Sequence, residues 1–152
     1  MDNEADILKK VMLFEKTNTD CPNGWARYIG TGNKCIKAFN EVKAYKDALE
    51  YCQKFKNGTL VSIHNAFQNV QVATHCSDLT ASVYYYIGLN NFKNINKYEW
   101  VDGSVLDYTN WLNAPVYNAI KAIHMHVDND GQGRWDWDFY YWSYYFVCMQ
   151  DL

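Results

Sequence analysis

Three features that would assign a chain to a common functional class are missing from this sequence. No run of 18 apolar residues occurs, so no segment is predicted to span a membrane. The net charge of −3 provides no basic excess for neutralising nucleic-acid phosphates. No glycine-rich phosphate loop is present, and no carboxylate pair is supported as a catalytic centre. The sequence therefore favours a binding protein over an enzyme, a membrane protein or a nucleic-acid-binding protein.

The cysteines also lack the spacing of metal-binding or redox motifs. Five are present, but no C-x-x-C pair and no Cys/His cluster with zinc-finger spacing occurs. Wide, irregular spacing favours disulfides in an oxidising compartment, so we predict a secreted, extracellular protein. The sequon Asn57-Gly58-Thr59 agrees with this as a candidate glycosylation site. The acidic, polar N-terminus has no signal-peptide features, so a secreted domain would be a processed form.

The length of 152 residues suits one domain with a short extension, and 49% apolar residues suffice for a core. We assign residues 1–20 to an N-terminal extension and 21–152 to the domain. Apolar residues recur at helical spacing over 4–17, which predicts a helix. That helix either packs on the domain or forms a short neck that self-associates, although two turns of apolar stripe are few for a coiled coil.

The domain itself is predicted to alternate strands and helices before a long irregular stretch. A capping box at Asn65 and Gln68 marks the start of its second helix. Residues 90–121 carry many turn residues and little periodicity, and a loop of this length is usually functional. This order indicates an α+β fold. The predicted elements are a hairpin over 21–40, helices over 42–55 and 65–78, and strands over 60–63, 84–89, 122–127, 134–137 and 144–149.

Seven short motifs then occur in a characteristic order. They are Cys21-Pro22 to Trp25 with Cys35, Tyr45-x2-Ala48-x3-Cys52, Leu60-Val61-Ser62-Ile63, Tyr86-Ile87-Gly88-Leu89, Trp100-x-Asp102-Gly103-Ser104, Tyr108-Thr109-Asn110-Trp111 and Phe146-Val147-Cys148. Over about residues 21–150 the chain resembles the long form of the C-type lectin-like domains, in wording closest to invertebrate, especially nematode, members. The resemblance implies an α+β fold with two helices, small antiparallel sheets and a long loop region.

The resemblance also implies a disulfide pattern. Cys21 pairs with Cys35 and Cys52 with Cys148, which leaves Cys76 unpaired. The family's loop disulfide would fall near Ala122 and Tyr140, which cannot cross-link, so packing must hold the loop. Cys76 is expected to be either a buried small hydrophobe or an interchain bridge. Two routes to a homodimer therefore stay open, namely Cys76 and the N-terminal helix.

The calcium site of sugar-binding members is degenerate in this chain. Their calcium ligands come from a Glu-Pro-Asn or Gln-Pro-Asp triplet and from the Asn-Asp of a Trp-Asn-Asp motif. Here the triplet is Ala114-Pro115-Val116, and Asp136-Trp137 follows Trp135. Calcium takes six to eight oxygen ligands, which these positions cannot supply. The resemblance therefore implies no cofactor and no calcium-dependent mannose or galactose site.

Two other groups of residues are candidate metal sites. Asp128, Asp130, Asp136 and Asp138 would be the first ligands to consider for a rebuilt calcium site, but the EF-hand pattern is missing and Asp128 to Gly133 reads as a solvated turn. His124 and His126 share one face of a predicted strand and could ligate zinc or copper, or form a polar face. No third ligand is fixed by the sequence, so no metal site is assigned.

Aromatic residues are unusually dense near the C-terminus, where nine of the twelve residues from 135 to 146 are aromatic. Exposed rings suit sugar stacking or protein recognition, whereas buried rings would fill the space left by the missing disulfide. We predict a binding module that recognises a protein or glycan through its long loop and aromatic surface. The alternative is a lectin that uses aromatic stacking or a rebuilt calcium site. The candidate ligand-binding residues are Asn110, Trp111, Tyr117, Trp137, Tyr141 and Trp142.

Overall fold

A computed structural model describes residues 3–17, 21–80, 84–128 and 131–152 and shows the predicted α+β fold. The helices alternate with strands in the first half, and the second half is built from strands and loops. The elements are α1 (Glu4–Thr17), β1 (Ala26–Arg27), β2 (Lys34–Lys43), α2 (Tyr45–Cys52), β3 (Thr59–Leu60), α3 (Ala66–Leu79), β4 (Tyr84–Asn94), β5 (Lys97–Trp100), β6 (Ala122–His126), β7 (Arg134–Asp138) and β8 (Tyr144–Asp151).

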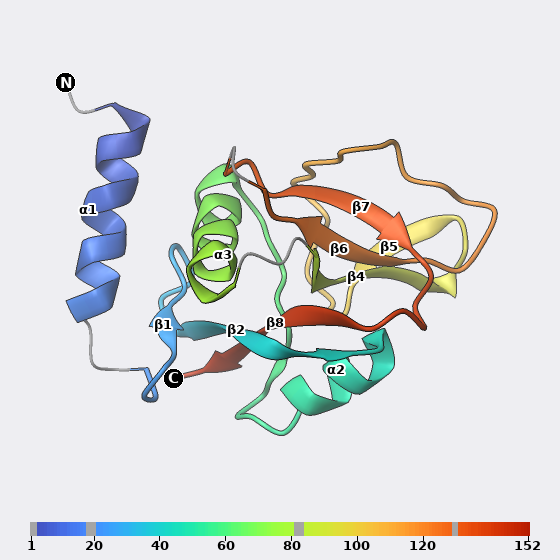
Figure 1. Ribbon diagram of the computed structural model, residues 1–152, viewed down its shortest axis with the longest axis horizontal. Coiled ribbons are helices and arrows are strands. Elements are labelled where there is room, and N and C mark those ends of the chain that lie inside the picture. The colour runs from blue at the N-terminus through green and yellow to red at the C-terminus, as the bar shows by residue number, and fades with distance from the viewer. Residues whose placement is uncertain (1–2, 18–20, 81–83, 129–130) are drawn as a thin grey trace.

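The strands form a single mixed sheet rather than separate small ones. Its order is β1-β2-β8-β4-β6-β7, with β3 paired to β8 and β5 paired to β4. The pairs are antiparallel except β4 with β8, where Tyr85 lies beside Tyr145 and Tyr86 beside Phe146. This short parallel contact joins two antiparallel parts. Figure 1 shows α2 along the β2–β8 part, whereas β5, β6 and β7 lie at the other side of the molecule.

The helices are placed by the residues that the sequence pattern singled out. In α2, Tyr45, Ala48 and Cys52 are fully buried on one face. In α3, the Asn65 side chain accepts a hydrogen bond from the Gln68 backbone N–H at 2.9 Å, so the predicted cap is formed. The N-terminal helix α1 is also formed, and it stands beside the domain near β1 (Figure 1).

The structure pairs Cys21 with Cys35 and Cys52 with Cys148, the pairs that the resemblance implies. The thiol of Cys76 is free and buried in α3, and burial raises its pKa well above the ordinary value. The structure therefore decides between the two roles of Cys76. A thiol with no exposed surface packs as a small hydrophobe and cannot bridge to a second chain.

Two predicted boundaries were wrong. Helix α2, predicted over 42–55, begins at Tyr45 rather than residue 42, because β2 continues to Lys43. Lys43 pairs with Tyr144 of β8 beyond an irregularity in the ladder. The helix ends at Cys52 rather than 55, and the turn that follows needs Gly58, since a Cβ there would lie 2.0 Å from the Cys52 carbonyl oxygen. Long-range pairing and a tight turn thus overrode the apolar periodicity.

The long loop is also shorter than the predicted 90–121. Strand β4 continues to Asn94 and turns through residues 95–96 into β5. The Asn94 side chain accepts a hydrogen bond from the Asn96 N–H at 2.9 Å, which stabilises the turn. The many asparagines of this stretch led to the prediction of an irregular loop instead of a hairpin. The irregular segment is therefore residues 101–121, which we call the long loop.

Candidate functional site

Side chains outside the long loop fix both of its ends. At the start, Asp102 accepts hydrogen bonds from the Ser62 hydroxyl at 2.6 Å and the Ser104 N–H at 2.9 Å. Burial by itself would raise the pKa of Asp102, but these bonds and the nearby His64 hold it below the usual value. At the end, the Asn91 side chain donates to the Ala119 carbonyl at 2.9 Å and accepts from the Lys121 N–H at 2.6 Å. The loop therefore leaves and re-enters the sheet at fixed points.

Trp135 of β7 holds the middle of the loop. Its backbone N–H donates to the Asn110 carbonyl at 2.8 Å, and its carbonyl accepts from the Leu112 N–H at 2.7 Å. Its indole N–H donates to the Asn69 side chain at 2.8 Å. The ring is fully buried, with the Trp100, Tyr108 and Trp111 rings edge-on at 5.5–5.8 Å. These contacts hold the long loop on β7 where no loop disulfide is available to do so.

Aromatic side chains also hold the loop segment 114–116, where the resemblance places calcium ligands of sugar-binding members. The Trp137 indole N–H donates to the Ala114 carbonyl at 3.1 Å, and the Tyr98 hydroxyl donates to the Val116 carbonyl at 2.6 Å. The Asn113 amide donates to the Asp136 carboxylate at 3.2 Å. The loop segment around Pro115 is thus joined to β7 and β5 by direct hydrogen bonds between protein groups.

A buried lysine lies beneath this segment. Lys121 is 5% exposed, and its Nζ lies 4.9 Å from the centre of the Trp137 ring and 3.7 Å from that of Phe139. A cation held against two ring faces is stabilised by their negative quadrupoles. Trp137 therefore packs as part of the loop support, and it is half-buried rather than fully exposed.

The exposed rings gather in the turn between β7 and β8, residues 139–142, which we call the aromatic turn. Tyr141 is 54% exposed and Trp142 51% exposed. The backbone of the turn is fixed, because the Tyr140 carbonyl accepts the Tyr45 N–H at 3.0 Å and the Trp142 carbonyl accepts the Tyr86 hydroxyl at 2.5 Å. The aromatic turn therefore presents large rings from a rigid frame.

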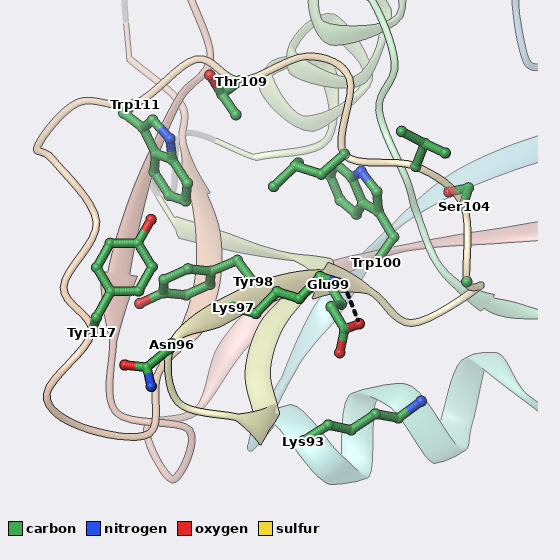
Figure 2. Close-up of a pocket in the computed structure, with 13 residues that line it drawn as sticks. Lys93, Asn96, Lys97, Tyr98, Glu99, Trp100, Ser104, Thr109, Trp111 and Tyr117 are labelled. Atoms are coloured by element: carbon green, nitrogen blue, oxygen red, sulfur yellow. Dashed lines mark ion pairs between the residues drawn. The ribbon is translucent and has the colours of Figure 1, made fainter.

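A groove of about 630 Å³ lies between β5 and the long loop (Figure 2). Of the predicted ligand-binding residues, Trp111 and Tyr117 line it. Tyr141 and Trp142 lie on the aromatic turn instead, and the Asn110 amide is engaged with the carbonyls of Gln132 and Gly133 at 2.9 and 3.1 Å. The sequence grouped these residues as one surface, and the structure separates them into two. It also adds groove residues that carried no sequence signal: Lys93, Lys97, Val105 and Leu106.

His124 is buried at 3% exposure in β6, and its Nδ1 has no hydrogen-bond partner among the described residues. Burial lowers the pKa of His124 to about 4; Asp136 and Asp138 oppose this shift and His126 adds to it. The rings of Tyr84 and Tyr144 lie 4.7 and 5.2 Å away. This is an apolar and aromatic setting for a neutral imidazole.

Within the described ranges, no three His, Cys, Asp or Glu side chains converge as metal ligands. Of the candidate carboxylates for a rebuilt calcium site, Asp128 is exposed, Asp138 accepts the Tyr144 hydroxyl at 2.5 Å, and Asp130 lies outside the described residues. The candidate glycosylation residue Asn57 is exposed, and its side-chain amide donates to Asp151 at 2.7 Å.

The family is shown by comparison with known proteins. Residues 41–150 match the family described as the lectin C-type domain. The chain is 37% identical over 94 residues to C-type lectin BPL of Bothrops pirajai, covering 60% of this chain and 67% of that protein. Human lithostathine superposes with a TM-score of 0.78 at 24% identity, covering 90% and 94% of the two chains. EMS16, described as an antagonist of the collagen receptor integrin α2β1, has a TM-score of 0.63 at 30% identity, covering 86% and 98%.

The chain therefore belongs to the C-type lectin family. One of these relatives is named as a C-type lectin and another is described as an integrin antagonist, and neither name is that of an enzyme. In the part of the chain that the structure describes, no helix is long and apolar enough to cross a membrane.

Proposed function

We propose that the protein is an extracellular binding module that recognises a glycan or protein ligand without calcium. The observation that carries this proposal is the 3.1 Å hydrogen bond from the Trp137 indole to the Ala114 carbonyl. The resemblance assigns both residues to positions of calcium ligands in sugar-binding members, and here they contact each other directly. Because the Ala114 carbonyl already accepts this hydrogen bond, a cation at this point would have to displace the indole N–H.

The ligand surface in this proposal is the aromatic turn together with the long loop. Tyr141 stacks on Phe139 with ring centres 5.2 Å apart and Trp142 packs beside it at 5.7 Å. Large rings on a fixed backbone lose little entropy on binding, which suits both sugar stacking and protein recognition. Relatives named as a lectin and as an integrin antagonist support these two ligand classes. Two disulfides support an extracellular location.

Calcium dependence is tested by thermal unfolding in millimolar calcium and in chelator. A ligand present at a hundred times its dissociation constant stabilises the folded state by about 2.7 kcal/mol, which is readily detected. We expect the two melting temperatures to coincide. A chelator-sensitive shift would contradict the proposal and would direct attention to Asp128, Asp136 and Asp138, and to Asp130 outside the described residues.

The ligand class is tested by probing arrays of glycans and of extracellular proteins, each in calcium and in chelator. Binding should be equal in both conditions. Trp142→Ala should weaken it by about 1 kcal/mol or more and leave the melting temperature nearly unchanged. Phe67→Ala is the matched control, since Phe67 is an exposed ring on α3 outside both surfaces. Equal losses in the two variants would remove the aromatic turn as the ligand surface.

A further inference from the structure

The groove opens along one edge of strand β5. Successive side chains of a strand point to opposite faces of its sheet, yet all four residues of β5, Lys97 to Trp100, line the groove. A cavity reaches both faces of a strand when it runs along the strand's edge. Figure 2 shows β5 with the long loop arching across from it. The other edge of β5 is the one that pairs with β4.

The backbone on this edge is available. No backbone hydrogen bond joins residues 97–99 to a described residue outside β4. The Tyr98 hydroxyl holds the loop at a distance through Val116, so the loop faces β5 without pairing to it. An unpaired strand edge is a template on which an extended peptide can form main-chain hydrogen bonds.

The side chains around the edge define the chemistry of the occupant. The loop side presents exposed apolar groups, namely Val105 at 73% exposure, Leu106 and, further along the groove, Tyr117. The opposite rim carries Lys93, Lys97 and Glu99. Lys97 pairs with Glu99 at 3.5 Å, whereas Lys93 has no ion pair with any described residue. An occupant that fits both sides therefore has an apolar side chain for the loop and a carboxylate for Lys93.

We propose that this groove binds an extended segment of a partner protein, with apolar and acidic residues in alternation, as an added strand on β5. Alternation matters because an added strand directs one set of side chains to Val105 and Leu106 and the other set to the lysine rim. This inference rests in part on the proposed function, because long-loop residues such as Leu106 and Tyr117 line the groove, whereas no residue of the aromatic turn does. The groove variants and Trp142→Ala therefore test the two surfaces separately.

The test uses synthetic hexapeptides and the intact protein. The first probe alternates valine with aspartate, the second replaces each aspartate by lysine, and the third is the first peptide with N-methylated backbone amides on one edge. We expect saturable binding of the first probe, with amide NMR shifts at residues 97–99. The other two should bind at least about tenfold more weakly, through loss of the charge contact and of the main-chain hydrogen bonds respectively.

Three exposed positions supply the protein variants, two in the groove and one control outside it. Lys93→Glu should weaken the aspartate peptide about tenfold and favour the lysine peptide, whereas Lys46→Glu, on α2 outside the groove, should change neither. Val105→Asp should weaken the aspartate peptide as well, and its high exposure makes a folding defect unexpected. The proposal is overturned if the N-methylated peptide binds as well as the parent, if Trp142→Ala removes binding, or if a glycan rather than any peptide shifts residues 97–99.

Discussion

Two halves of this domain are held together by different physical means. In the half formed by α2, β2 and β8, which we call the disulfide half, Cys52–Cys148 joins residues 96 positions apart. The Phe39 and Phe146 rings stack beside it, with centres 5.2 Å apart. In the half formed by β4–β7 and the long loop, which we call the loop half, rings and hydrogen bonds do this work. Trp135 and Trp137 join the loop to β7.

This difference predicts which half of the molecule is more sensitive to substitution and to pH. A disulfide acts mainly by restricting the unfolded chain, so its contribution survives local changes in packing. Ring contacts and hydrogen bonds exist in the folded state and depend on each donor, acceptor and charge. The disulfide half should therefore be robust to single substitutions other than at its cysteines. The loop half should respond to individual side chains and to pH.

The largest expected effect is loss of the long-range disulfide. Replacing both Cys52 and Cys148 with alanine should lower the free energy of unfolding by about 4.7 kcal/mol on the loop-entropy estimate, measured by urea denaturation. The matched control is the double alanine variant at Cys21 and Cys35, which close a 14-residue separation and should cost about 3 kcal/mol. A larger loss in the control would contradict the assignment of Cys52–Cys148 as the main constraint.

Acid should weaken the loop half next. The pKa of His124 is about 4 in the folded protein against 6.5 for the unperturbed group, so the folded state disfavours protonation. The contribution of neutral His124 to the free energy of unfolding is therefore fully present above pH 6.5. It decreases as the pH falls and the unfolded state takes up a proton, and it decreases no further below about pH 4, where the folded state is protonated too. The total loss is on the order of 3 kcal/mol.

Urea denaturation from pH 7 to 4 measures this dependence. His124→Gln should flatten the profile over that window, whereas His126→Gln, at a half-buried position on the same strand, should retain the slope. If the His124→Gln and parent profiles have equal slopes, the imidazole of His124 does not cause the acid sensitivity.

A smaller effect is expected at the Trp137–Ala114 hydrogen bond. Trp137→Phe keeps a ring near Lys121 but removes the donor to the Ala114 carbonyl, and a lost hydrogen bond of this kind costs about 1 kcal/mol. The long loop should become more susceptible to limited proteolysis. Trp142→Phe, at an exposed ring, serves as the control and should change neither quantity. Unchanged proteolysis in Trp137→Phe would show that the indole does not hold the loop.

The smallest effect is expected at Cys76. Because its thiol is buried and its pKa is raised, thiol reagents should modify it at a measurable rate after denaturation and not before. A non-reducing gel should show no disulfide-linked dimer. A dimer band that Cys76→Ser removes would contradict the buried position. Self-association through α1 stays a separate prediction, to be tested by deleting residues 1–20 and measuring mass in solution.

Local signals predicted much of the fold. The cap at Asn65 predicted the start of α3, and the motifs around Gly88 and Phe146 located two strands that lie side by side in the sheet. The resemblance implied both disulfides. Predicted element boundaries were wrong where pairing with another strand decided the boundary. Lys43 lies in a strand because it pairs with β8, and Asn94 lies in a strand because it pairs with β5.

The sequence by itself determined which functional groups are missing, because the residue type at a position can be read without knowing the fold. Ala114, Val116 and Trp137 carry no carboxylate, and Ala122 and Tyr140 cannot form a disulfide. Tertiary structure decided what replaced that chemistry. The indole of Trp137 meets the Ala114 carbonyl from 23 residues away. The burial of Cys76 arises where segments distant in the chain pack together, and the open edge of β5 arises where they leave a gap. The spacing of residues along the chain does not encode such contacts.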